Sequence, residues 1–159
     1  MKQKVLSVKQ PWSFLICSGI KPIENRSWKC PQKYIGERVL IHASGDKKLN
    51  LSNLTREQYN DACDKFDWNS TTVKPVDRWD RSAIIGSVRF VDCTINHPSI
   101  WAEKTEVIND PEFTFLPAYG KKTYNWVVAD PILFDKPILN VKGKLGFWNY
   151  ELPEEYENC

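Results

Sequence analysis

The sequence has no long hydrophobic run. A membrane-spanning helix needs about 18 or more consecutive apolar residues, and no such stretch occurs in the chain. The N-terminus also lacks the basic and then apolar pattern of a secretory signal. We therefore expect a soluble, cytoplasmic protein with no membrane partner.

Cysteine and histidine are too few and too scattered to indicate a metal or redox centre. The five cysteines are odd in number and widely spread, and no C-x-x-C pair occurs among them. His42 and His97 are the only histidines. His42 lies in an apolar stretch, which favours a hydrogen-bonded core residue over a metal ligand. We expect reduced thiols, no metal and no cofactor.

The chain also lacks repeats, low-complexity runs and a phosphate-binding glycine loop. Residues 142–148 contain two glycines and two lysines, but not in the G-x-x-x-x-G-K-[ST] spacing of a P-loop. We interpret the glycines as a bend before a strand in which Phe147 and Trp148 close the core, and Lys144 as a candidate cleft cation. A length of 159 residues without internal divisions predicts one domain over residues 1–159.

Charge is unevenly distributed along the chain. Residues 1–48 contain ten Lys or Arg against three Asp or Glu, whereas residues 49–159 contain twelve against seventeen. A basic segment that also carries Trp12 and Trp28 predicts a phosphate-binding surface with stacking platforms. The alternative is that scattered surface lysines only keep the protein soluble. The net charge of only +2 predicts modest affinity or a small ligand, not a clamp on long duplex DNA.

A short helix is predicted near the N-terminus. Four residues follow helical spacing: Trp12, Leu15, Ile16 and Gly19. Pro11 suits the first helical position, and Gly19 suits the left-handed residue that ends a helix. Lys21 should therefore lie directly after the end of this helix.

A strand with charged side chains follows the predicted helix. Residues 23–28 alternate in polarity, which places Glu24 and Arg26 on one face, roughly 6.5–7 Å apart at the backbone. Together with Lys21, these side chains predict a binding pocket at a helix-to-strand junction. The alternative is an exposed strand face that carries an ordinary ion pair.

Several motifs around this junction follow one another in a fixed order. They are Leu6 to Trp12, Gly19-Ile20-Lys21, Glu24-Asn25-Arg26-Ser27-Trp28, Gly36, residues 40–44, residues 85–88, residues 126–131 and residues 141–148. This series resembles the ASCH (activating signal cointegrator 1 homology) domain family. The resemblance implies an α+β fold, a PUA-like β-barrel with flanking helices. It also implies RNA or other nucleic acid bound in a cleft beside the barrel, into which the motif's lysine and arginine project.

Activity varies within the family that the chain resembles. Some small bacterial members are amidohydrolases that remove an acyl group from modified cytidine with a lysine, a threonine and a glutamate. The lysine corresponds to Lys21, but Glu24 occupies the threonine position. A carboxylate cannot form the intermediate that a hydroxyl forms, which counts against that activity. Hydrolysis stays open if Glu24 acts as a base on water and Lys21 stabilises negative charge.

The leading hypothesis is an RNA- or nucleotide-binding domain. Its partner would be RNA, single-stranded nucleic acid or a nucleoside-sized ligand. The predicted contact residues are Gln10, Trp12, Lys21, Glu24, Arg26, Trp126 and Lys144. One alternative is a hydrolase, amidohydrolase-like or a nuclease, that acts on modified nucleosides or RNA with Lys21 and Glu24 as its acid–base pair. The other is a protein-interaction domain with a vestigial cleft.

The rest of the chain is predicted to be mainly structural. Thr55 and Gln58 form a capping box that predicts a helix over 55–67, with Asp61 on its solvated face. Gly86 within the strand-like stretch 82–91 indicates a bulge or a close approach of another backbone or a ligand.

Two further boundaries follow from proline. A strand over 124–129 is predicted to end at Asp130-Pro131. Residues 96–122 are predicted to form a long loop that lids the cleft.

Overall fold

A computed structural model describes residues 1–44, 51–65, 80–106 and 121–156 of the chain. Within these ranges, six strands form one mixed sheet in the order β2-β5-β4-β3-β1-β6. Their bounds are β1 Lys2–Lys9, β2 Ile23–Arg26, β3 Arg38–Ser44, β4 Ala83–Thr94, β5 Tyr124–Ile138 and β6 Phe147–Glu151. Strands β1 and β3 run parallel, and the other neighbours run antiparallel.

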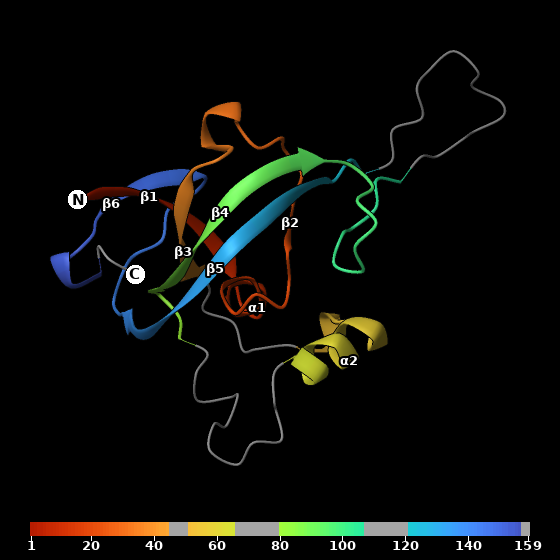
Figure 1. Cartoon of the computed structure of the whole chain (residues 1–159), viewed down its shortest axis with the longest axis horizontal. Helices are drawn as coiled ribbons and strands as arrows, with labels where there is room; N and C mark the ends of the chain where they lie inside the picture. Colours follow the sequence, from red (N-terminus) through yellow and green to blue (C-terminus); the bar gives the residue numbers. More distant parts are fainter. Residues whose placement is uncertain (45–50, 66–79, 107–120, 157–159) are drawn as a thin grey trace, which may run out of the picture.

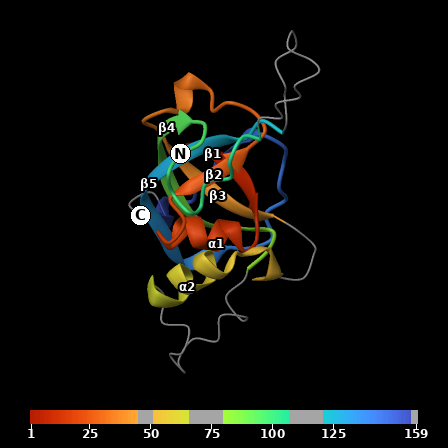
Figure 2. The same cartoon turned by 90° about the vertical axis from the view of Figure 1, so that its right-hand side faces the viewer.

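The two α-helices lie on the same side of the sheet (Figure 1). The α-helices are α1, Trp12–Cys17, and α2, Arg56–Lys65, and short 3-10 turns occur at Gln32–Tyr34, Leu51–Asn53 and Glu154–Tyr156. In both views α2 lies beyond α1, away from the strands (Figures 1 and 2). No helix in the described part of the chain is long and apolar enough to cross a membrane. The predicted α+β class is confirmed.

The sheet is strongly curled but open. Among the described residues, the end strands β2 and β6 are not paired with each other, so the predicted closed barrel is not confirmed. The curl nevertheless brings Trp28, just after β2, to a ring-centroid distance of 6.0 Å from Phe147 of β6. The long, bent pair β4 and β5 forms the middle of the curl (Figure 1).

Aromatic side chains fill the inside of the curl. Trp126 is fully buried, stacks on Phe147 at 5.7 Å and meets Phe90 edge-on at 5.4 Å. Aromatic pairs in these geometries add to the free energy gained from area burial alone. The prediction that Phe147 and Trp148 close the core is confirmed, since Trp148 is also buried.

Helix α1 packs on the sheet at a glycine. Pro11 is the N-cap of α1 and not its first helical residue, because its carbonyl accepts the bond from Leu15 N. Gly19 has a φ of +79°, as predicted. A Cβ on Gly86 would lie 3.0 Å from Cys17 Sγ and would collide with the Ile132 carbonyl. The close approach predicted at Gly86 is therefore confirmed.

Strand β5 continues past its predicted end. Arg89 pairs with Ala129 and Ser87 pairs with Ile132, so β5 holds one extra residue between these two rungs of the ladder. The prediction that Asp130-Pro131 ends the strand is wrong because a bulge accommodates both residues: Asp130 takes a φ of +48°. A proline is tolerated in a bulge, where the chain needs no ladder N–H.

Helix α2 begins at the predicted capping box. Thr55 N donates to Gln58 Oε1 at 3.1 Å, and Gln58 N donates to Thr55 Oγ1 at 3.2 Å. Asp61 does not simply face solvent, because it accepts a 2.9 Å hydrogen bond from the Trp101 indole. This bond ties α2 to the 96–106 segment. The rest of the predicted 96–122 loop lies largely outside the described residues.

Candidate functional site

A cleft of about 1050 Å³ opens between β2 and the end of β1. Strand β6 pairs with β1 only from Lys2 to Leu6, so in the part of the chain that the structure describes Ser7–Lys9 of β1 have no strand partner on that side. The walls of the cleft come from the end of β1, from Trp12 of α1, from β2, from the start of α2, from Trp101 and Glu103, and from the 142–146 loop. Five Lys or Arg and two Glu line it. The lining is therefore cationic overall.

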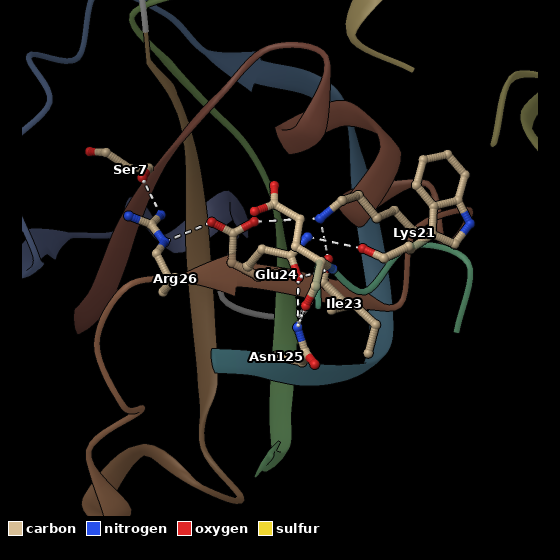
Figure 3. Close-up of polar contacts among 9 residues, drawn as sticks. Ser7, Lys21, Ile23, Glu24, Arg26 and Asn125 are labelled. Atoms are coloured by element: carbon tan, nitrogen blue, oxygen red, sulfur yellow. Dashed lines mark hydrogen bonds and ion pairs between the residues drawn. The ribbon is translucent and has the colours of Figure 1, made fainter. Parts of the chain in front are cut away.

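The charged residues of β2 form one connected network in this cleft (Figure 3). Glu24 Oε1 lies 2.7 Å from Arg26 Nε, and Glu24 Oε2 lies 3.7 Å from Lys21 Nζ. Arg26 Nη2 donates to the Ser7 carbonyl at 2.8 Å, and Lys21 Nζ donates to the Ile23 carbonyl. The predicted common face of Glu24 and Arg26 is confirmed.

Burial differs along this network. The exposed fraction of the side chain is 4% for Lys21, 8% for Glu24 and 22% for Arg26. Burial lowers the pKa of the Lys21 ammonium, and the nearby Glu24 carboxylate partly offsets this. Lys21 Nζ also lies 5.5 Å from the centroid of the Trp12 ring. Lys21 thus forms the floor of the cleft, while Arg26 is the more accessible cation.

Asn25 points the other way and holds a second wall of the cleft in place. Its amide nitrogen donates to the Trp101 carbonyl at 2.9 Å, and its amide oxygen accepts from Glu103 N at 3.1 Å. Asn125 of β5 donates to the same oxygen at 2.9 Å. The 101–103 segment is therefore fixed to β2. It forms one wall of the cleft. The lid predicted for the 96–122 loop stays a prediction.

The structure brings five of the seven predicted contact residues to the cleft wall. They are Trp12, Lys21, Glu24, Arg26 and Lys144. The other two take structural roles instead. Gln10 caps α1 by accepting from Phe14 N at 3.2 Å. Trp126 is fully buried, so it is not placed to stack on a ligand, but its ring centroid lies 5.9 Å from Arg26 Cζ.

Sequence reasoning missed two polar residues on the cleft side of the sheet. Ser7 and His42 are partners in the parallel ladder of β1 and β3, and both line the cleft. His42 was predicted to be a hydrogen-bonded core residue, and it is buried with Nε2 2.8 Å from the Val141 carbonyl. A polar residue inside each of the apolar runs 5–8 and 39–43 was the signal that could have indicated this face.

The protonation of His42 follows from its one bond. A carbonyl can only accept, so Nε2 carries the proton and Nδ1 is an acceptor. Nδ1 is buried without a hydrogen-bond partner in the described structure, and burial lowers the pKa of the imidazole. No group of three or more possible metal ligands occurs within the described ranges.

Comparison with known proteins places the chain in a family. The model of the ASCH domain matches residues 6–138, so the chain belongs to the ASCH domain family, whose PUA-like members generally bind nucleic acid. It is similar to a solved ASCH structure from Zymomonas mobilis, with 15% identity over 96% of this chain and 88% of that chain and a TM-score of 0.49.

Two solved single-residue variants of that Zymomonas mobilis protein are also similar. Their identities are 15% and 14% over 96% of this chain and 91% and 89% of theirs, with TM-scores of 0.46 and 0.47. No curated protein matches the chain.

Proposed function

We propose that the cleft binds single-stranded RNA or a nucleotide-sized piece of it. The observation that carries this proposal is the joined cluster of Lys21, Glu24 and Arg26 in a cleft lined by five Lys or Arg and two Glu. Excess positive charge in a concave site attracts phosphate. Membership of a family that generally binds nucleic acid supports the same conclusion.

Arg26 is the residue best placed to bind phosphate or a base edge. A guanidinium has five N–H donors. One Nη2 donor of Arg26 binds the Ser7 carbonyl, and Nε is held by an ion pair with Glu24, without an aligned hydrogen bond among the described residues. These two partners fix the orientation of the fork, and the remaining donors stay available. A donor that is oriented before binding loses less conformational entropy when its ligand arrives.

Trp12 and Lys21 complete the proposed contact surface. Trp12 is partly exposed in the cleft and offers a ring on which a base stacks. Lys21 is buried against this ring and beside Glu24. Its charge therefore acts from the floor, on a phosphate or base edge held above it.

Substitution of Arg26 tests this function directly. Fluorescence anisotropy would compare labelled single-stranded RNA, single-stranded DNA and duplex DNA across a salt series. Arg26→Ala should weaken RNA binding about 10- to 100-fold, the range for loss of a charge-assisted hydrogen bond. Arg89→Ala is the matched control, because Arg89 pairs with Asp130 and does not line the cleft. Equal affinities in the two variants would refute the site.

Hydrolysis of modified nucleosides or RNA is a second candidate function. It is favoured by the buried Lys21, whose pKa is lowered, 3.7 Å from Glu24. In this alternative Glu24 takes a proton from water and Lys21 stabilises the developing negative charge. Glu24→Gln should abolish turnover in protein that circular dichroism shows to be folded. A pH–rate profile that is unchanged in this variant would exclude the hydrolase.

A further inference from the structure

The 142–146 loop presents an apolar side chain to water beside the cleft. Leu145 is 99% exposed, whereas the other exposed large hydrophobic residues of the described structure range from 37% to 59%. Lys142 and Lys144 are also exposed, and all three residues line the cleft. A single exposed leucine is ordinary on a protein surface, so its importance depends on how the loop holds it.

The loop is fixed to the sheet on both sides of Gly143. Val141 N donates to the Ser82 carbonyl at 2.7 Å, and the Val141 carbonyl accepts from His42 at 2.8 Å. The Lys144 carbonyl accepts from Ser7 Oγ at 3.0 Å. These bonds set the path of the backbone directly before Leu145.

Gly143 makes this attachment close. A Cβ on Gly143 would lie 2.6 Å from His42 Cε1 and 3.2 Å from Ser7 Oγ, so only glycine lets the loop approach β1 and β3 so closely. Gly146 follows Leu145 with a φ of +63°, a conformation that glycine adopts without strain. The loop backbone, and not a chance rotamer, therefore directs Leu145 into solvent.

We propose that Leu145 packs against an unpaired base of the bound strand while Lys142 and Lys144 contact its phosphates. This inference rests on the proposed function and extends it from a nucleotide to a strand. An exposed apolar side chain that directly follows two exposed lysines suits a single-stranded nucleic acid, which presents both unpaired base faces and phosphates to one surface. The cleft is also as large as pockets that enclose ligands of drug size, about 300–1,000 Å³, which leaves room beyond one nucleoside.

The test compares two leucines. Leu145→Ser should bind labelled single-stranded RNA about tenfold more weakly than the unmodified protein, because the burial of one leucine side chain against a base is lost. The salt dependence should keep its slope, because no charge is removed. Leu139→Ser is the matched control: Leu139 is 54% exposed but does not line the cleft, and this variant should bind normally.

A base analogue reports the contact itself. RNA that carries 2-aminopurine should change its fluorescence when the unmodified protein binds, and Leu145→Ser should lose part of this change. Duplex RNA should bind more weakly than the single strand, because its bases are not available to Leu145. Equal binding of duplex and single strand would overturn the inference.

The remaining outcomes separate this inference from the proposed function. If the unmodified protein binds no nucleic acid, both fail. If Arg26→Ala abolishes RNA binding and Leu145→Ser leaves affinity and 2-aminopurine fluorescence unchanged, the inference alone fails. If Leu145→Ser instead abolishes self-association in sedimentation velocity while RNA affinity is unchanged, the surface belongs to a second copy of the chain and the inference is overturned.

Discussion

Two walls of the cleft, strand β2 and the 142–146 loop, differ in how their charges are held. On the β2 wall, Lys21 and Glu24 are almost fully buried and paired with each other. On the loop wall, formed by residues 142–146, Lys142 and Lys144 are exposed, and the loop is attached through its backbone. Burial of charge must be compensated within the fold, whereas exposed charge has little influence on folding. The β2 wall should therefore govern both stability and binding, and the loop wall should govern binding alone.

The largest expected effect is on the β2 wall. Glu24→Gln leaves the cations of Lys21 and Arg26 without their carboxylate, which should lower the free energy of unfolding by about 3 kcal/mol. Urea denaturation measures this loss. A second substitution, Lys21→Met, should restore much of it because the uncompensated buried charge is removed. Glu103→Gln is the matched control: Glu103 also lines the cleft, but its side chain is 58% exposed and pairs with Lys121. If the two glutamine variants lose the same free energy of unfolding, burial of the Glu24 charge is not what makes the β2 wall important for stability.

A smaller effect on stability is expected at His42, which joins the sheet to the loop wall through its hydrogen bond with the Val141 carbonyl. Burial lowers the pKa of His42 below its ordinary value of 6.5, so the unfolded chain takes up a proton at a higher pH than the folded protein does. Stability should thus be fully present above about pH 6.5 and should fall as the pH falls below it. Thermal unfolding across this range measures the loss.

Variants of the two histidines complete that measurement. His42→Gln should lose the acid-dependent decrease, and His97→Gln, which keeps His42, should retain it. An identical pH dependence in His42→Gln and the unmodified protein would show that another group is responsible.

The smallest effect on stability is expected on the loop wall. Lys142→Ala and Lys144→Ala should each change the free energy of unfolding by less than about 0.5 kcal/mol. Each should also reduce the salt dependence of RNA binding by about one phosphate contact. Lys136→Ala, on an exposed part of β5 outside the cleft, should leave the salt slope unchanged. Destabilisation by either loop variant would place these lysines in the fold.

Local sequence patterns predicted the parts of the fold that local interactions determine. The junction of α1 and β2 depends on helical spacing, a terminal glycine and strand alternation, and each of these acts within a few residues. The capping box of α2 is equally local. The strand end predicted at Asp130-Pro131 was wrong because pairing with β4 accommodates both residues in a bulge. Tertiary pairing outweighed the local signal.

The site was predictable on one wall only. Alternation indicates which face of β2 carries Glu24 and Arg26, but not what covers that face. Trp126 shares the face of its ladder partner Glu24 and is nevertheless enclosed by the aromatic core. The 101–103 segment and the 142–146 loop reach the cleft through hydrogen bonds between residues far apart in the sequence. No short-range periodicity encodes such contacts.

Arg26 has a consequence for the shape of the whole sheet. It extends from the edge strand β2 to the Ser7 carbonyl on β1, across the gap that strand pairing leaves open. The sheet thus resembles a split ring whose two sides are fastened by a clasp, and the cleft lies at the clasp. A ligand that binds Arg26 would add its own contacts across the split. Ligand binding and the separation between β2 and the end of β1 would then be coupled.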